Sequence, residues 1–229
     1  MRHAARAVRP RKTLLFVLPM NLPVTVIVLA AGASSRFTGG GHKLAQPLEG
    51  DGDVGAVLNV TLRNAIASRL PVLVVTTAEL APLASQQVAA RDLVILPAAR
   101  ARGMGDSIAA GVSARPDAAG WLVLPGDMPR VQPDTLQQVA QALQTHAVAY
   151  AQYRGLRGHP VGFSAELFSE LVALTGDEGA RRLLVRYPAE AVEVDDPGLL
   201  IDIDTVQDLA ALRAAAGGNG APAVLPPLH

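Results

Sequence analysis

The sequence predicts an α/β fold in which helices cover both faces of a mostly parallel sheet. Short apolar runs, such as 24–29 and 121–124, alternate along the chain with amphipathic helical segments. The runs are continuous and partly β-branched, which is typical of strands buried on both faces of a parallel sheet. Hydrophobic residues make up 50% of the 229 positions and charged residues 17%, so the chain can build one large domain.

The individual elements follow from apolar periodicity and from residues that end helices and strands. The first helix ends before Pro71, the third strand ends before Pro97, and Asp134 in the first turn of a later helix favours its dipole. The Gly-rich segment 155–162 predicts a hairpin or a loop. Strands are expected at 24–29, 72–75, 93–96, 121–124, 147–153 and 191–194. Helices are expected at 54–69, 80–90, 107–114, 133–143, 166–174, 178–186 and 205–216.

Charge and composition exclude several classes of protein. The 20 basic and 20 acidic residues balance, so no global positive field attracts nucleic acid, and aromatic residues at 3% are too few for stacking on single strands. The absence of cysteine excludes disulfides, thiolate nucleophiles and cysteine-based metal sites. We therefore expect no nucleic-acid partner.

The N-terminal region allows two interpretations. The apolar stretch 13–33 follows a basic head and ends in small residues, as in a signal peptide or a membrane anchor. Pro19 and Pro23 interrupt this stretch, where a spanning helix would be continuous. We therefore expect a cytoplasmic protein without a membrane segment, with Met20 as an alternative start. The expected division is an extension at 1–22, one folded domain at 23–216 and a flexible tail at 217–229.

The loop after the first strand is the first candidate site, because ligands of such sheets bind at the carboxyl ends of the strands. The loop is rich in small residues, and no acidic residue precedes Glu49. Its backbone N–H groups can approach an anion, with Arg36 and Lys43 supplying positive charge. Lys43 is one of only two lysines among the 20 basic residues, which suggests a position that needs a compact ammonium. The alternative is a flexible surface turn.

Two aspartates are candidate metal ligands. Asp127 follows the strand at 121–124, and its carboxylate is well placed to hold a divalent cation on phosphate oxygens. In the segment 201–205, alternation places Asp202 and Asp204 on one face, and Asp204 is the candidate second ligand. The alternatives are structural: an Asp in a Pro-Gly turn at 125–127, and a capping-box-like helix start formed by Thr205 and Asp208.

Three further segments carry polar groups. The segment 103–107 opens a helix whose free N–H groups and Ser107 hydroxyl could bind ribose or base. The same segment resembles a hydrolase nucleophile elbow, but residues 98–102 separate it from the preceding strand. His159 precedes a proline, so it either contacts a substrate or bonds a backbone carbonyl. The segment 176–181 supplies a turn, a helix start and charged side chains.

Taken together, these segments resemble the nucleotidyltransferases of molybdenum-cofactor maturation, the MobA/MocA-like NTP transferases. The resemblance covers about 24–213, and its specificity comes from six motifs in the family's order. The motifs are Leu-Ala-Ala-Gly-x-Ser-x-Arg (29–36) with Lys43, Gly-Met-Gly-x-Ser (103–107), Gly-Asp-Met-Pro (126–129), Gly-His-Pro-Val (158–161), Gly-Asp-x-Gly-Ala-Arg (176–181) and Asp-Ile-Asp-Thr (202–205).

The resemblance implies a Rossmann-like three-layer sandwich, similar to nucleotide-diphospho-sugar transferases, that transfers a nucleoside monophosphate from an NTP with Mg²⁺ and releases pyrophosphate. It implies catalytic roles for Arg36, Lys43 and Asp127, and Mg²⁺ binding by Asp127 and Asp204. It implies acceptor binding by His159, Asp177 and Arg181. The implied nucleotide-binding residues are Leu29, Ala30, Ala31, Gly32, Ser34, Ser35, Gly103, Ser107 and Gly126.

The resemblance also implies a substrate pair. The Ala-Ala-Gly start and the Gly-Asp-Met-Pro motif are similar to the cytidylyl-transferring branch, which implies CTP, a molybdopterin acceptor, and a molybdoenzyme or its chaperone as partner. Six residues (37–42) separate Arg36 from Lys43, whereas the family spaces them as Arg-Met-Gly-x-x-Lys, so the branch and the acceptor stay open. The alternatives are another small acceptor such as a sugar phosphate, a non-catalytic cofactor-binding chaperone, and a serine hydrolase acting through Ser107.

Overall fold

The computed structural model describes residues 23–34, 37–38, 40–48, 55–97, 103–177 and 179–217, with the backbone alone at 215–217. The expected extension at 1–22 therefore lies outside the described residues, as do Ser35 and Arg36 of the first loop. The division into an extension, a domain and a tail stays a prediction. None of the helices within these ranges is long and apolar enough to cross a membrane.

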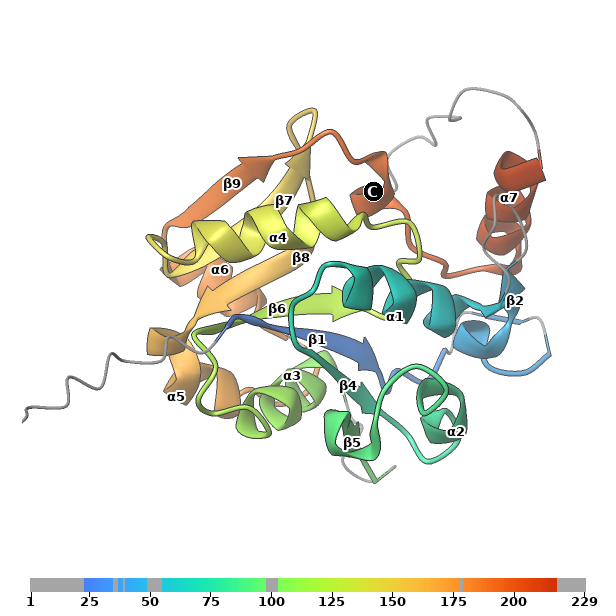
Figure 1. The fold of residues 1–229 in the computed structure, drawn as a ribbon, viewed down its shortest axis with the longest axis horizontal. Coiled ribbons are helices and arrows are strands. Elements are labelled where there is room, and N and C mark those ends of the chain that lie inside the picture. The colour runs from blue at the N-terminus through green and yellow to red at the C-terminus, as the bar shows by residue number, and fades with distance from the viewer. Residues whose placement is uncertain are drawn as a thin grey trace, which may run out of the picture.

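A seven-stranded sheet forms the centre of the molecule, in the order β5-β4-β1-β6-β8-β7-β9 (Figure 1). The strands β5, β4, β1 and β6 pair in parallel, and β9 is parallel to β7. Only β8 runs antiparallel to its neighbours, so the sheet is mostly parallel, as predicted. The strands are β1 (Thr25–Ala30), β4 (Val72–Thr76), β5 (Leu93–Ile95), β6 (Gly120–Pro125), β7 (Val148–Tyr153), β8 (Leu156–Ser164) and β9 (Ala189–Glu193).

Helices cover both faces of this sheet, as Figure 1 shows. The helices α1 and α4 pack on one face and α3, α5 and α6 on the other, which divides the buried side chains into two clusters. The α-helices are α1 (Val57–Ala67), α2 (Ala81–Ala84), α3 (Met104–Ser113), α4 (Pro133–Ala142), α5 (Phe168–Val172), α6 (Arg181–Arg186) and α7 (Val206–Gly217). The short elements are the 3₁₀ turns η1 (Lys43–Ala45), η2 (Ala90–Asp92), η3 (Ala165–Leu167) and η4 (Pro197–Leu200), and the strand pair β2 (Pro47–Leu48) and β3 (Gly55–Ala56).

The first strand shows why the apolar runs predict the sheet. Val26, Ile27 and Val28 are completely buried, because one face of β1 contacts α1 and the other contacts α3. Helix α3 comes this close because Gly111 has no side chain: a Cβ there would lie 2.6 Å from Cγ2 of Ile27. Burial on both faces accounts for a run without polar alternation.

The structure corrects two expected elements and decides a third. The helix expected at 80–90 ends at Ala84, and the N–H groups of Gln86 and Gln87 then bond carbonyls three residues back, as in a tightening turn. Helix α3 begins at Met104 instead of 107. Of the two alternatives for 155–162, the hairpin is confirmed, because the segment forms the turn and most of β8, which pairs antiparallel with β7.

Candidate active site

Lys43 joins two carboxylates that are distant in sequence. Its Nζ donates to Asp127 Oδ2 at 2.6 Å and to Asp204 Oδ1 at 2.9 Å. The three side chains are partly buried, with exposed fractions of 13%, 16% and 23%. The structure thus brings together one cation of the first loop and both predicted metal-binding aspartates.

Lys43 is positioned by a hydrogen-bonded clip in the first loop. The His42 side chain caps η1, because its Nδ1 accepts from the Leu44 N–H at 3.2 Å. Nδ1 is then the acceptor, so Nε2 carries the proton that it donates to the Gly32 carbonyl at 3.0 Å. Ser34 Oγ also lies 3.2 Å from the ring nitrogens. His42 therefore holds the two ends of the loop together. Nothing in the sequence indicated this role, because His42 belongs to no recognisable motif.

The described part of the loop is open to an anion at its glycine. A Cβ at Gly32 would meet no atom within 4 Å, so its backbone borders open space, whereas Ala30 and Ala31 are buried. Leu29 contributes its carbonyl, which accepts from the Gly126 N–H at 2.8 Å. The start of this loop is thus anchored to the turn that carries Asp127. Whether these residues bind a nucleotide stays a prediction.

Asp127 is held by backbone contacts on both sides of its turn. Thr61 of α1 donates to the Gly126 carbonyl at 2.9 Å, and Asn64 donates to the Pro129 carbonyl at 2.8 Å. A Cβ at Gly126 would lie 2.9 Å from the Leu29 carbonyl oxygen, so only glycine allows this approach. The Pro-Gly turn therefore presents Asp127 rigidly, and the structural and the metal-binding interpretations are compatible.

Asp204 is positioned by the helix cap that follows it. The Asp208 carboxylate accepts from the Asp204 N–H (3.1 Å) and the Thr205 N–H (2.7 Å), and the Asp208 N–H donates to Thr205 Oγ1 (3.2 Å). This reciprocal pair is the predicted capping box. The Ile203 N–H donates to the Asp127 carbonyl at 3.2 Å, which ties the segment to the turn.

Charge is concentrated at this point. Burial lowers the pKa of Lys43, but its two carboxylate partners outweigh burial and the pKa is raised overall, so Lys43 is cationic at neutral pH. Burial by neighbouring atoms raises the pKa of Asp202, and the carboxylates of Asp204 and Asp127 raise it further. The charges of Asp204 and Asp127 thus act on Asp202, whose side chain is exposed. Alternation placed it beside Asp204, but the predicted set omitted it.

The carboxylates fit a divalent cation. Asp127 Oδ1 is buried and has no hydrogen-bond partner among the residues that the structure describes, so this carboxylate oxygen can serve as a metal ligand. Within the described ranges, no group of three or more His, Cys, Asp or Glu side chains forms a ready-made metal site. Mg²⁺ fits such a place, because it is commonly bound by one or two carboxylates and completes its shell with substrate phosphates and water.

The segment 103–107 packs against the loop at 175–177. The Gly105 N–H donates to the Gly176 carbonyl at 2.8 Å, and a Cβ at Gly103 would lie 2.3 Å from the Gly176 carbonyl carbon. Ser107 is buried inside α3 and its hydroxyl faces the Gly103 carbonyl at 3.4 Å. A nucleophile elbow exposes its serine at a turn, so the geometry argues against the hydrolase alternative.

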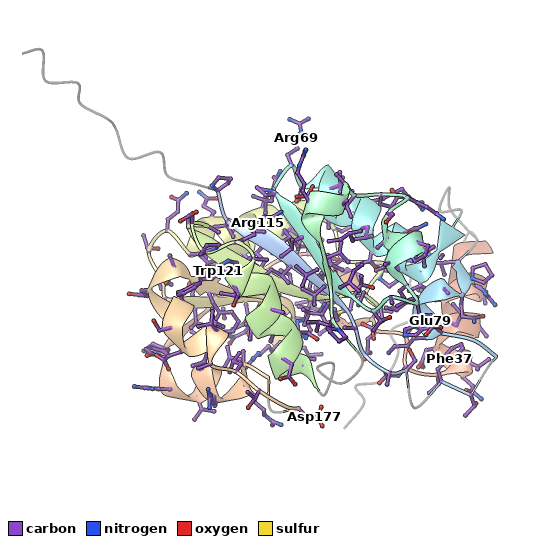
Figure 2. The ribbon with its side chains drawn as sticks, turned by 90° about the horizontal axis from the view of Figure 1, so that it is seen from below. Phe37, Arg69, Glu79, Arg115, Trp121 and Asp177 are labelled. Carbon is purple, nitrogen blue, oxygen red and sulfur yellow. The ribbon has the colours of Figure 1, made fainter. Side chains whose placement is uncertain are left out.

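The three expected acceptor-binding residues differ in position. His159 lies in β8, whereas Asp177 and Arg181 are exposed near the start of α6, and Figure 2 shows Asp177 at the periphery. The pKa of His159 is lowered, chiefly by burial and to a smaller extent by the positive charge of Arg157. A hydrogen bond to the Val123 backbone and the negative charge of Asp127 act in the opposite direction. His159 therefore lies near Asp127. No contact among the described residues joins Asp177 or Arg181 to Lys43.

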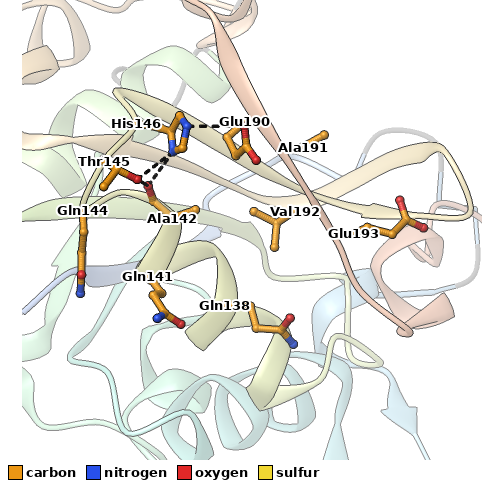
Figure 3. A pocket seen from close by; sticks show the side chains of 10 residues that line it. All are labelled: Gln138, Gln141, Ala142, Gln144, Thr145, His146, Glu190, Ala191, Val192 and Glu193. Atoms are coloured by element: carbon orange, nitrogen blue, oxygen red, sulfur yellow. Dashed lines mark hydrogen bonds and ion pairs between the residues drawn. The ribbon is translucent and has the colours of Figure 1, made fainter.

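A separate groove of about 530 Å³ lies between α4 and β9. Figure 3 shows its lining, which contains several glutamines and an ion pair of His146 with Glu190 at 3.5 Å. It contains none of the predicted site residues. We therefore place the candidate active site at the Lys43–Asp127–Asp204 cluster.

Solved structures share this architecture. The crystal structure of Rv0371c from Mycobacterium tuberculosis H37Rv is 28% identical, with a TM-score of 0.70 over 84% of this chain and 98% of that chain. Its manganese complex matches at 26% identity, a TM-score of 0.68 and the same coverage. The fold is the expected Rossmann-like sandwich of nucleotide-diphospho-sugar transferases.

The class of protein that this fold and site define is the nucleotidyltransferases. The family model of the MobA-like NTP transferase domain matches residues 26–192. The chain therefore belongs to the MobA-like NTP transferase family, as the motifs predicted.

Two relatives match nearly their whole length. The purine catabolism protein PucB of Bacillus subtilis is 35% identical over 202 residues, which cover 82% of this chain and 95% of PucB. The molybdenum cofactor cytidylyltransferase of Escherichia coli is 25% identical over 191 residues, with 83% and 95% coverage.

Proposed function

We propose that this nucleotidyltransferase moves CMP from CTP onto a molybdopterin-type acceptor with Mg²⁺ and releases pyrophosphate. The observation that carries the proposal is the convergence of Lys43, Asp127 and Asp204 at 2.6 and 2.9 Å beside an open Gly32 backbone. The similarity to the Escherichia coli molybdenum cofactor cytidylyltransferase supports the nucleotide and the acceptor.

The chemistry needs positioning and charge neutralisation more than a covalent partner. Lys43 binds the triphosphate as a compact ammonium, and the N–H groups of the loop bind its oxygens. Asp127 and Asp204 would hold the cation, which supplies neutralisation of the developing negative charge. The manganese complex of Rv0371c supports a divalent cation in a related protein. A phosphate acceptor is already ionised at neutral pH, so the proposed reaction needs no strong base.

A second candidate differs in the acceptor. PucB is the more identical of the two relatives, and its name assigns it to purine catabolism. A nucleotidyltransferase that serves purine catabolism through another small acceptor therefore stands beside the first candidate. A non-catalytic molybdopterin-binding chaperone, with a molybdoenzyme as partner, is the third candidate.

A thermal-shift screen of CTP, GTP, ATP and UTP with Mg²⁺ tests the nucleotide, because a ligand that binds only the folded state raises Tm. We expect CTP to give the largest increase, and a larger increase with another NTP would contradict the CMP assignment. Pyrophosphate release with CTP and molybdopterin then tests catalysis. Nucleotide binding without pyrophosphate release would favour the chaperone.

The metal role needs a variant of its own. Asp127→Asn keeps the side-chain shape, and we expect pyrophosphate release to fall at least about 100-fold, as when one transition-state contact worth about 3 kcal/mol is lost. Asp195→Asn, at an exposed carboxylate, is the matched control and should leave the rate unchanged. Retained turnover in Asp127→Asn would remove the metal role from Asp127.

A further inference from the structure

The β7–β8 hairpin extends along the same edge of the sheet as the Lys43–Asp127–Asp204 cluster. Strand β8 runs antiparallel to β6 and sets Val161 opposite Val123. Residues 157–159 precede Val161 in β8 and so lie toward the end of the sheet where β6 ends, and Asp127 lies in the turn after β6. The reversed direction of β8 therefore brings residues 157–159 to the carboxyl ends of the parallel strands.

Two arginines of this hairpin are stacked on tyrosines, on opposite faces. The guanidinium of Arg157 lies 4.9 Å from the ring centroid of Tyr150, and that of Arg154 lies 4.9 Å from the ring centroid of Tyr153. Tyr150 packs against the cluster under α3, α5 and α6, whereas Tyr153 packs against the cluster under α1 and α4. The two pairs have the same chemistry and differ in the face that they occupy.

The Arg157 face also carries His159, which the resemblance assigns to the acceptor. Arg157 and His159 alternate with Gly158 and so share one face of β8, and the charges of Arg157 and Asp127 both act on the His159 ring. The opposite face is closed, because a Cβ at Gly158 would lie 2.2 Å from the Leu199 carbonyl of η4. That turn is held in place by the buried Asp196, which accepts from the Gly198 N–H at 2.9 Å and from Thr135 Oγ1 at 2.6 Å.

The guanidinium of Arg157 is positioned so that it can bind an anion. Among the described residues, no carboxylate pairs with Arg157, which is exposed and held by the Tyr150 ring. Within the part of the chain that the structure describes, the buried His159 Nδ1 has no hydrogen-bond partner, so the polar capacity of this ring is not fully used. A planar guanidinium binds phosphate or carboxylate through two parallel hydrogen bonds, and stacking on an aromatic ring fixes its orientation.

We propose that Arg157, oriented by Tyr150, binds an anionic group of the acceptor on the side of His159 away from Asp127. This inference rests on the proposed function for the identity of the ligand as the acceptor. The proposal predicts that the acceptor carries a negatively charged group, which Arg157 binds. Arg154 is the matched comparison, because its stacked pair lies on the face opposite to His159.

The test is an NMR titration of the ¹⁵N-labelled full chain with phenyl phosphate, a small phosphomonoester. The side-chain Nε–H resonances of the two arginines are assigned by their absence in Arg157→Gln and Arg154→Gln. We expect the Arg157 resonance to shift saturably, with an apparent Kd about tenfold lower than the value at Arg154. Similar titration of both resonances, or of neither, would overturn the proposal.

Tyr150 is a positioning residue, and two variants test that role. Tyr150→Phe keeps the ring and should keep the Kd at Arg157, whereas Tyr150→Leu should raise it toward the value at Arg154. An unchanged Kd in Tyr150→Leu would remove Tyr150 from the proposal.

The titration is run both with and without saturating α,β-methylene CTP and Mg²⁺. With the CTP analogue present, the nucleotide site is occupied and cannot bind the phenyl phosphate. If no NTP raises Tm, the proposed function fails and the Arg157 titration is still readable. If CTP binds and Arg157 does not respond, only the Arg157 proposal fails.

Discussion

Replacing Lys43 by methionine tests how the site balances its charge. The ammonium contacts two carboxylates at 2.6 and 2.9 Å, and all three side chains are at least three-quarters buried, with exposed fractions of 13–23%. Methionine keeps the length of the side chain and removes the charge. The aspartates at 127 and 204 would then repel each other without a counter-ion.

The expected cost follows from these contacts. A hydrogen bond to a charged group contributes about 1.5–3 kcal/mol to the free energy of unfolding. Because the two bonds share one ammonium in a site that water partly reaches, we expect the variant to lose about 2–4 kcal/mol in total. For a domain of this size, about 1 kcal/mol shifts Tm by about 2–4 °C, so Tm should fall by roughly 5–15 °C. Differential scanning calorimetry in EDTA measures this change.

A divalent cation should reverse the loss of stability in Lys43→Met. With the ammonium gone, Mg²⁺ or Mn²⁺ can neutralise the two carboxylates, so the cation should raise Tm more in the variant than in the wild type. Pyrophosphate release should stay low, because the triphosphate has also lost its lysine. Stability and activity therefore respond differently to the same cation.

Arg115→Met is the matched control. Arg115 pairs with Asp92 at 2.7 Å, but the two side chains are 30% and 27% exposed, and pairs of this kind contribute about 0–1 kcal/mol. An equal Tm for the two variants, or an equal gain of Tm from the cation, would refute the reasoning about the buried counter-ion.

Three further predictions follow from single residues. His42→Ala should raise the Kd for the NTP in a calorimetric titration, because it removes the side-chain bonds to Gly32 and Leu44 that hold the loop. An unchanged Kd would show that these bonds do not position the loop. Gly111→Ala should destabilise by about 1–3 kcal/mol in urea unfolding, because its Cβ would meet Ile27 at 2.6 Å, whereas Gly32→Ala, with no atom within 4 Å, should not. Burial lowers the pKa of His159 in the folded protein below its unfolded value of about 6.5. The neutral ring therefore contributes its full stability above pH 6.5, and this contribution is lost as the pH falls toward and through the lower pKa of the folded state. The Tm of the wild type should therefore fall more steeply below pH 6.5 than that of His159→Asn, and His146→Asn, at an exposed histidine, should follow the wild type.

Much of the fold could be predicted from local patterns. The runs around Val26 and Val123 lack polar alternation because both faces of their strands are covered, and that property is visible in the sequence. Thr205 and Asp208 formed the expected capping box because the motif acts within one helical turn. The helix predicted at 80–90 is wrong beyond Ala84, because the chain tightens there into bonds between residues three apart, which apolar periodicity does not distinguish from a helix.

The sequence by itself determined the order of strands and helices and the residue types at the carboxyl ends of the strands, because these follow from short-range apolar periodicity and from the chemistry of small and charged residues. Only the tertiary structure decided that Lys43 meets carboxylates 84 and 161 positions away. It also decided that β8 alone is reversed, which carries His159 and Arg157 to the same edge. Such contacts depend on which strands pair and in which direction, and no local pattern encodes that choice.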